Sequence, residues 1–326
     1  MYASATDLGT VWTNGANQTL STGRWTGEKS VSLGSQSIYQ NVSDPGPTFS
    51  VCFAAKTTSP ANALNFSLPI LYNAAGLSTP QCCLAIQNSA GTVTVCRGGT
   101  AGTNVLGTSA VGAFPPDGQW HYIEWTVTLN ATTGSFTVKV DGNTVLTGSG
   151  VNTLGSGSST AIGSLAFAGT SSTWQVADVY LTNGASLGEM RFPCKMPNSD
   201  SSVQWTKNTG ASNNAAVNQL PTDGDTTYVS SSTPGQIDKY GMAALGISPS
   251  TIPCVRVFWQ GRKDDVSARQ VRSKLYSGVT TSNGVTQALG SSYAFYSDLY
   301  QNDPNTSAAW TITGLDACLG GIEEIA

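Results

Sequence analysis

Charge is the scarcest property of this sequence. Only 10% of its 326 residues are Asp, Glu, Lys or Arg, against roughly 25% in an average soluble domain. Gly, Ser, Thr and Asn fill the gap, which is typical of β-sandwiches with many short strands and argues against helical bundles. The net charge is −4 and no basic cluster stands out. We therefore expect no nucleic-acid partner, because phosphate binding needs a basic face.

Long apolar runs are missing as well. No stretch of about 18 consecutive apolar residues occurs, so we expect no membrane span. The opening residues, MYASATDLGTVW, have neither a basic n-region nor an apolar h-region. This pattern predicts no secretory signal, and hence synthesis in a cytoplasm.

Metal-binding patterns are sparse. His121 is the only histidine, and the seven cysteines include no C-x-x-C pair, so we expect no zinc site. Most of the cysteines should be buried as small hydrophobic residues. If the segment around Cys82 and Cys83 is a strand, these two point to opposite faces.

The strongest pattern is the stretch 119–148, QWHYIEWTVTLNATTGSFTVKVDGNTVLTG. Its apolar residues alternate with polar ones over 122–129 and again over 136–140, which predicts two adjacent strands with one buried face. Asp141-Gly142 predicts a tight turn, because glycine tolerates a positive φ. A shift of one residue would expose Trp125 and Phe136, so the register should be well determined.

Similar short strands surround this hairpin. Strands are predicted at 48–56, 83–87, 92–97 and 174–181, and Pro69 inside 64–72 predicts an edge strand or a bulge. In the second half, 254–259 is a predicted strand with 269–276 as its partner, 293–300 is another strand, and 313–319 is a helical turn. The fold class is therefore all-β, with two antiparallel β-sandwich (jelly-roll) domains at 1–187 and 188–326.

Three motifs in the first domain suggest a family. Trp120–Trp125 (WHYIEW), Val140–Val145 (VDGNTV) and Asp178–Leu181 (DVYL) together resemble the concanavalin A-like lectin/glucanase superfamily, in its laminin G-like or pentraxin-like branch. The resemblance covers about 5–187. It implies a domain that binds glycans or proteins, sometimes through calcium, or a glycosidase.

The second domain carries a different resemblance. The segments DGDTTYVSSSTPGQIDKYGM, ARQVRSKLYSG, YAFYSDLYQNDPNTSAAWT and GLDACLGGIE are similar to a domain of bacteriophage virion proteins that follows a concanavalin A-like domain. This resemblance implies a tail, fibre or capsid-decoration protein of the virion, made in the host cytoplasm. Its partners would be other virion proteins, and it would form a homo-oligomer, with a trimer as our expectation.

Catalytic patterns are weak. A glycosidase needs two carboxylates at a defined separation, but Glu124 and Asp178 each stand alone in their strands, and they could pair only if those strands were neighbours. A Ser-His-Asp triad would have to use His121, the only histidine, which lies between two aromatic residues at the start of a predicted strand. We therefore interpret His121 as a strand residue that bonds its neighbours. We therefore predict that the chain is not an enzyme. The alternative is a carbohydrate-active enzyme or adhesin that acts on a surface polysaccharide.

Two sets of residues are candidates for binding. Asp223, Asp225 and Asp238 are calcium candidates, because oxygen ligands on a turn suit that ion; the alternative is a turn in which Asp bonds its own backbone. Otherwise we expect no cofactor.

Aromatic rings are the second set of candidates, because sugars stack on aromatic rings. We expect rings in loop or edge contexts to bind host surface polysaccharide, namely Trp12, Trp25, Tyr39, Tyr296 and Tyr300.

Overall fold

The computed structural model describes residues 2–3, 12, 19–26, 28–34, 37–57, 65–87, 90–155, 159–168, 174–220 and 222–326. The chain divides into two compact units, Met1–Phe192 (unit 1) and Pro193–Ala326 (unit 2), whereas the sequence suggested a boundary at 187/188. The prediction of an all-β antiparallel protein is confirmed, with 47% strand and 3% helix. No helix in the described part of the chain has the length and apolar character to span a bilayer.

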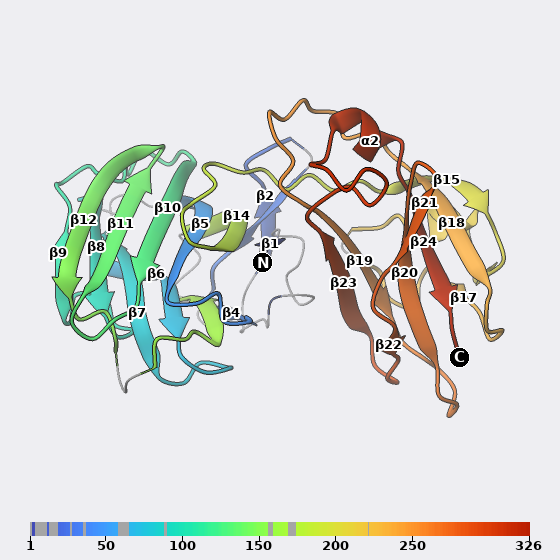
Figure 1. The fold of residues 1–326 in the computed structure, drawn as a ribbon, viewed down its shortest axis with the longest axis horizontal. Coiled ribbons are helices and arrows are strands. Elements are labelled where there is room, and N and C mark those ends of the chain that lie inside the picture. The colour runs from blue at the N-terminus through green and yellow to red at the C-terminus, as the bar shows by residue number, and fades with distance from the viewer. Residues whose placement is uncertain are drawn as a thin grey trace. The chain divides into compact units, whose positions relative to one another are not determined.

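Unit 1 is a sandwich of two antiparallel sheets (Figure 1). The larger sheet has the order β12-β11-β10-β5-β14-β3-β2, with β1 paired to β14. Its strands are β1 (Tyr2–Ala3), β2 (Thr19–Thr22), β3 (Lys29–Ser32), β5 (Thr48–Thr57), β10 (His121–Thr128), β11 (Gly134–Val140), β12 (Asn143–Val151) and β14 (Trp174–Asn183).

The smaller sheet of unit 1 has the order β4-β13-β6-β7-β8-β9. Its strands are β4 (Ile38–Asn41), β6 (Asn65–Tyr72), β7 (Pro80–Gln87), β8 (Thr92–Arg97), β9 (Val105–Thr108) and β13 (Ser164–Phe167). β6 lies inside the sheet, and its pairing with β7 shifts between Ser67 and Ile70. The proline at 69 therefore lies at a bulge, one of the two positions predicted.

The core of unit 1 lies between the two sheets and follows the alternation of the sequence. Phe53 and Trp125 from the larger sheet meet Leu71, Leu84 and Phe167 from the smaller one, all fully or almost fully buried. The predicted hairpin forms as β10 and β11, and its apolar set points into this core. Asp141 and Gly142 have φ values of +49° and +77°, which confirms the tight turn.

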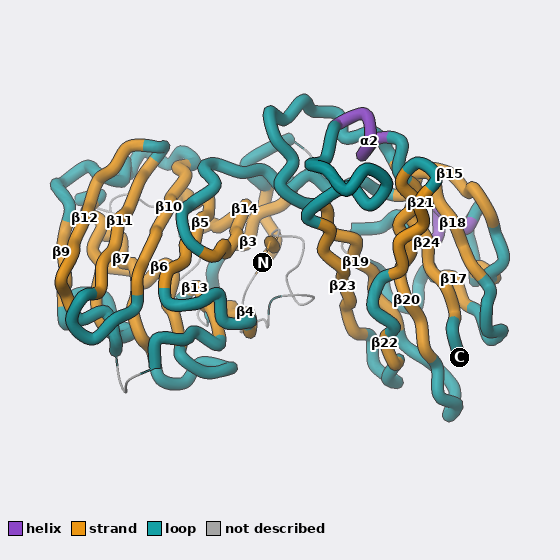
Figure 2. The backbone as a smooth tube through the Cα atoms, in the orientation of Figure 1, coloured by secondary structure: helices purple, strands orange, loops and turns teal. Residues whose placement is uncertain are grey.

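Unit 2 is the smaller unit. It consists mainly of strands joined by loops (Figure 2), and a small cluster around Leu275 and Trp310 is buried. Its main sheet has the order β15-β18-β24-β20-β21, with β22 paired to β20. The elements of unit 2 are β15 (Pro197–Ser202), β16 (Thr206–Lys207), α1 (Asn213–Ala216), β17 (Val229–Ser230), β18 (Ile237–Met242), β19 (Val255–Gly261), β20 (Gln270–Ser277), β21 (Thr280–Asn283), β22 (Gln287–Ala288), β23 (Ala294–Tyr300), α2 (Ile312–Asp316) and β24 (Leu319–Glu324).

One predicted pairing in unit 2 is wrong. The strand 254–259 was assigned 269–276 as its partner, but β19 pairs with β23, and β20 pairs with β24, β21 and β22. The β19–β23 ribbon packs Val255, Val257 and Tyr300 against Leu275 and Trp310. Local alternation shows which residues share a face, but it does not specify the neighbouring strand. The helical turn predicted at 313–319 forms as α2, four residues of which (313–316) lie in that range.

Candidate functional site

A polar region of unit 1 lies on the outer surface of its larger sheet. In β10 the residues between the core positions point away from the core, and Thr126 and Thr128 are half-buried there. The register places Thr126 opposite Ser50 and Thr137, and Thr128 opposite Thr48 and Ser135. We call these six residues, Thr48, Ser50, Thr126, Thr128, Ser135 and Thr137, the hydroxyl face.

Hydrogen bonds between side chains tie the hydroxyl face together. The hydroxyl oxygens of Ser50 and Thr126 are 2.7 Å apart, and those of Thr48 and Thr128 are 3.0 Å apart. A hydroxyl both donates and accepts, so the half-buried Thr48, Thr126 and Thr128 still have bonding capacity toward a ligand, whereas Ser50 is fully buried. The surface is therefore polar but uncharged, and it presents hydroxyls from three adjacent strands.

A segment that follows β14 crosses this sheet. We call residues 184–192 the strap. Gly184 has a φ of +75° at the turn, its N–H donates to the Thr48 carbonyl at 2.9 Å, and the Ser50 hydroxyl donates to the Gly184 carbonyl at 2.7 Å. Farther along, the Tyr180 hydroxyl donates to the Gly188 carbonyl at 2.7 Å and accepts from the Leu187 N–H at 3.0 Å. These bonds hold the strap against the sheet.

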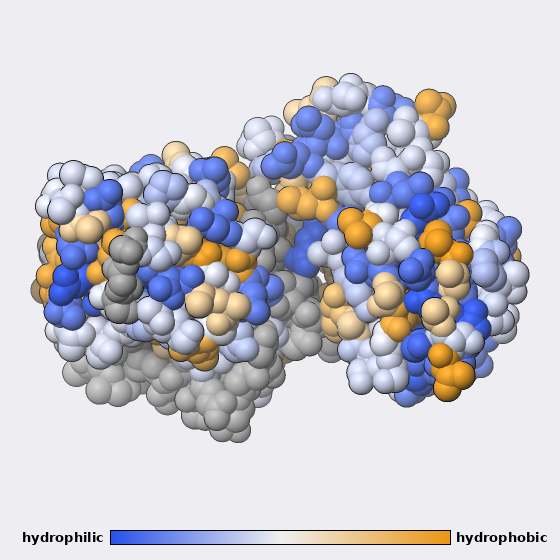
Figure 3. Space-filling view, turned by 60° about the horizontal axis from the view of Figure 1, so that its bottom comes forward, coloured by the Kyte–Doolittle hydropathy of each residue, from blue (hydrophilic) through white to orange (hydrophobic). Residues whose placement is uncertain are grey.

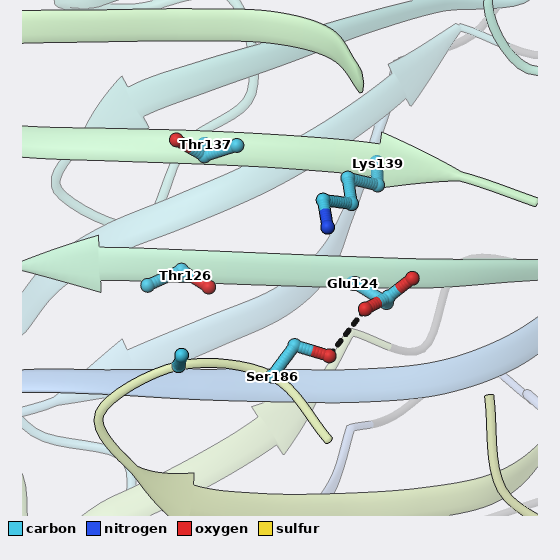
Figure 4. A pocket seen from close by; sticks show the side chains of 6 residues that line it. Glu124, Thr126, Thr137, Lys139 and Ser186 are labelled. Carbon is cyan, nitrogen blue, oxygen red and sulfur yellow. Dashed lines mark hydrogen bonds between the residues drawn. The ribbon is translucent and has the colours of Figure 1, made fainter. Parts of the chain in front are cut away.

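The strap and the hydroxyl face together form a pocket of about 210 Å³. Its lining residues are Glu124, Thr126, Thr137, Lys139, Ala185 and Ser186. Figure 4 shows the Lys139 side chain reaching from β11 toward β10, and the Ser186 hydroxyl reaching from the strap to Glu124. The volume is below the roughly 300–1,000 Å³ of drug-sized ligand sites, so the pocket suits one small polar unit.

Charge in the pocket comes from two side chains. Glu124 lies opposite Lys139 in the β10–β11 pairing and accepts a hydrogen bond from Ser186. Lys139 forms no ion pair with a described carboxylate, so its ammonium donors are available. The pocket therefore combines an acceptor-only carboxylate, a donor-only ammonium and several hydroxyls. Neither Lys139 nor Ser186 was singled out from the sequence.

A second charged cluster anchors the far end of the strap. Asp178 is 4% exposed, has a φ of +49° and lies where the β14–β5 register shifts, which defines a bulge. The Trp25 Nε1 donates to its carboxylate at 3.1 Å. Burial, followed by the nearby charge of Glu28, raises the pKa of Asp178 to about 6.

Two arginines complete this cluster. Arg24 pairs with Glu189, and the Arg191 Nε lies 2.7 Å from a Glu28 oxygen. Both guanidinium groups lie 4.9 Å from a ring centroid of Trp25, within cation–π range. The cluster thus ties the strap to Arg24, Trp25 and Glu28.

The structure answers the question left open about paired carboxylates. β10 and β14 flank β5 on opposite sides, so Glu124 and Asp178 are not on neighbouring strands. The first belongs to the pocket and the second to the strap anchor. The sequence did not predict either environment, because the surroundings of both carboxylates include residues of the strap.

His121 has a structural environment, as the sequence suggested. Its Nδ1 lies 2.6 Å from Asp141 and its Nε2 lies 3.0 Å from Asp117, and its ring meets Phe114 edge-on. Burial acts to lower the pKa of His121, but hydrogen bonds to the two carboxylates outweigh it, so the pKa is raised. The imidazolium therefore bridges the loop before β10 and the turn after β11.

This bridge makes the stability of unit 1 pH-dependent. Because the pKa of His121 is higher in the folded state than its unfolded value of about 6.5, protonation of His121 stabilises the fold. This stabilisation is fully present below about pH 6.5 and is lost as the pH rises through the pKa of the folded state. We expect the melting temperature to fall between about pH 6 and pH 8, and His121→Gln to lack this component. Thermal unfolding of both proteins across that range measures it, and equal pH slopes would contradict it.

The three calcium candidates have separate environments in unit 2. Asp223 bonds the N–H and hydroxyl of Thr227, at 3.2 and 2.9 Å, within a turn. Asp225 pairs with Arg262 at 2.9 Å, and Asp238 is fully buried in β18. Across the described residues, no group of three or more His, Cys, Asp or Glu side chains is arranged to hold a metal ion.

The aromatic candidates also differ in environment. Trp12 is 3% exposed and packs edge-on against Phe167 in the core, while Trp25 is half-buried in the strap anchor. Tyr39 packs on the outer side of the smaller sheet. Tyr296 stacks on Trp259 at 4.5 Å, and Tyr300 packs against the core of unit 2. None of the five lines the pocket.

Comparison with known proteins gives matches in structure alone. No family model matches the chain, and no curated protein does. An endo-beta-1,4-glucuronan lyase from Trichoderma reesei has 14% identity over 54% of this chain and 90% of its own, with a TM-score of 0.34. The carbohydrate recognition domain of Emp46p has 13% identity over 54% and 90%, with a TM-score of 0.37.

A Trypanosoma rangeli sialidase has 14% identity over 53% of this chain, with a TM-score of 0.37, and the match spans 27% of the sialidase. An alginate lyase, Aly36B, has 15% identity over 48% of this chain and 81% of its own, with a TM-score of 0.32. By their names, these four structures are glycan-binding or glycan-acting proteins.

These matches correct the prediction that the chain is not an enzyme, since two lyases and a sialidase are among them. The prediction relied on the missing pair of carboxylates. That criterion describes most glycoside hydrolases, but sialidases use a tyrosine nucleophile instead, and lyases break the chain by elimination. The missing pair therefore excludes one catalytic arrangement and leaves enzymatic activity open.

Proposed function

We propose that unit 1 binds a glycan at the pocket between the strap and the hydroxyl face. The observation that supports this most is the convergence of Glu124, Lys139 and Ser186 beside two threonine hydroxyls. Sugar hydroxyls donate and accept hydrogen bonds, and this lining offers both kinds of partner. The pocket lining contains no aromatic ring, so recognition relies on hydrogen bonds rather than on stacking.

The neighbouring surface extends the pocket along a polysaccharide. Thr147 and Ser149 on β12 lie opposite Thr137 and Ser135 and are exposed. Hydroxyls therefore continue over four adjacent strands, β12, β11, β10 and β5. Outside the pocket, such a surface loses little hydration energy when a neutral polar chain covers it, because its hydroxyls carry no charge.

Binding should depend on Lys139. We expect Lys139→Ala to weaken the Kd for a bound glycan at least about tenfold, the effect of losing a hydrogen bond to a charged group. Thr137→Val, which conserves shape, should weaken it by a smaller factor. A glycan array with the full chain identifies the ligand, and calorimetry then compares the variants.

Lys29→Ala is the matched control, because Lys29 is an exposed lysine of the same sheet outside the pocket. It should bind like the natural chain, and all variants should keep the same melting temperature. An array without any bound glycan, or equal affinities of the Lys139 and Lys29 variants, would reject the proposal.

We also propose that the chain is a component of a bacteriophage virion, on the strength of the sequence resemblance over 188–326. The glycan site would then serve attachment to the host surface, and the chain would act as a homo-oligomer, a trimer by that resemblance. Immunogold labelling of purified virions tests the virion role independently of the glycan site. Label on a capsid or tail supports it, and virions without label refute it.

A further inference from the structure

Two cysteines face each other across the smaller sheet of unit 1. Cys83 in β7 is the direct cross-strand partner of Cys96 in β8. Both are fully buried, and both belong to the cluster on the outer side of this sheet, with Ile70, Tyr72 and Ala166. The adjacent Cys82 points the other way, into the main core, as the sequence predicted for two consecutive strand residues.

The backbone geometry at this pair is compatible with a disulfide. The Gly98 N–H donates to the Gln81 carbonyl at 2.8 Å, which makes 81 and 98 a hydrogen-bonded pair. Hydrogen-bonded and non-bonded pairs alternate along antiparallel strands, so 83 and 96 are again a bonded pair, with Cα atoms about 5.5 Å apart. Disulfides span Cα separations of about 4.4–6.8 Å. None of the cysteines forms a disulfide in this structure.

The chemistry of Cys96 differs from that of the other buried cysteines. Burial raises the pKa of Cys52 to about 11 and also raises that of Cys82. For Cys96, hydrogen bonds from Cys83 and from the Gly102 N–H outweigh burial and lower the pKa to about 7. The thiolate is the reactive form of cysteine, so reactivity at this pair is concentrated on one sulfur.

The glycine-rich loop after β8 lies next to this pair. Gly98 and Gly102 have φ values of +85° and +77°, and the loop closes where the Arg97 N–H donates to the Asn104 carbonyl at 3.0 Å. Gly102 also supplies the N–H that bonds Cys96. The loop backbone therefore contacts Cys96 directly. Because both cysteines are fully buried, we expect only an oxidant as small as a peroxide to reach their sulfurs.

We propose that Cys83 and Cys96 are a redox-active dithiol that a peroxide converts to a cross-strand disulfide. The Cys96 thiolate attacks one peroxide oxygen, which forms a sulfenic acid and expels hydroxide. The Cys83 sulfur then attacks the Cys96 sulfur, the S–S bond forms and the S–O bond breaks. The oxygen leaves as water with the Cys83 proton, so two thiols and one hydrogen peroxide give one disulfide and two waters.

Peptide mapping tests this directly. Lys56 and Arg97 bound one tryptic peptide that contains Cys82, Cys83 and Cys96. The native full chain is treated with hydrogen peroxide, then unfolded and alkylated. The peptide should then carry one alkyl group instead of three, and apart from the alkyl groups its mass should be lower by two hydrogens. Reduction should restore all three labels. The oxidised chain should also melt about 5 °C higher, because the link constrains the unfolded chain.

Three variants identify the linked sulfurs. Cys82→Ala, the matched control for loss of a buried thiol, should still form the link, while Cys83→Ser and Cys96→Ser should not. A link that involves Cys82, a link that persists without Cys96, or three labels on the oxidised natural chain would each overturn the proposal.

Discussion

Replacing Asp238 by alanine should lower the free energy of unfolding of unit 2 by about 4 kcal/mol. This carboxylate is fully buried and accepts hydrogen bonds from the backbone N–H groups of Gln204 and Trp205, both at 2.7 Å. It also accepts from Asn213 at 2.6 Å and Tyr240 at 2.8 Å. Alanine would leave all these donors buried without an acceptor.

The effect should be large because Asp238 connects segments far apart in the sequence. The bonds join β18 to the turn before β16 and to α1, in a unit whose core is small. Urea unfolding followed by tryptophan fluorescence measures the loss. Asp223→Ala is the control, since Asp223 is exposed and serves one turn, and it should cost less than about 1 kcal/mol. Equal midpoints for the two variants would contradict the assignment.

Asp178→Asn should have the opposite sign and stabilise unit 1 near neutral pH. The pKa of Asp178 is about 6, against an ordinary value of 3.8, because burial disfavours the carboxylate. The folded state therefore binds the proton more tightly than the unfolded state, and stability falls as the pH rises from about 4 to 6. At 1.36 kcal/mol per pKa unit, this costs roughly 3 kcal/mol above that range.

Asparagine suits the site because it tolerates a positive φ and can still accept from Trp25. We expect a gain of roughly 3 kcal/mol at about pH 7.5 and almost none at about pH 4, measured by urea unfolding at both values. Asp44→Asn, at an exposed aspartate of unit 1, should change stability little at either pH. A variant less stable than the natural chain at neutral pH would show that the carboxylate contributes net stability at the bulge.

Both predictions concern carboxylates whose roles depend on tertiary contacts. Asp238 was a calcium candidate on the basis of its sequence neighbours, but its bonding partners in the fold are backbone and side-chain donors. Asp178 seemed isolated in its strand, whereas Glu28, Arg24 and Trp25 surround it. Sequence spacing did not indicate these groups because they come from another part of the chain.

The distribution of hydrophobic residues on the surface agrees with the polar, charge-poor composition of the sequence. On the face drawn in Figure 3, the described hydrophobic residues appear as small separate groups among hydrophilic and intermediate ones. Individual apolar side chains are nonetheless well exposed, such as Val266 and Val279 at 100% and 99%. Scattered exposure of this kind is ordinary for soluble domains.

The sequence by itself determined the fold class and the local strands. Alternation of apolar and polar residues decides which side of a strand is buried, because successive side chains point to opposite faces. This is why Trp125 and Phe136 face the core, and why Cys82 and Cys83 face opposite ways. Turn chemistry determined the Asp141-Gly142 hairpin, since a positive φ is a local property.

Only the tertiary structure decided which strands are neighbours and where a site forms. The pairing of β19 with β23 instead of β20 depends on how the whole of unit 2 encloses its core, and no local pattern encodes that choice. The pocket likewise needs the strap, which places Ser186 against Glu124 although 62 positions separate them. Contacts of this range result from the packing of the complete sheet, so the residues of the site could be recognised only after the chain had folded.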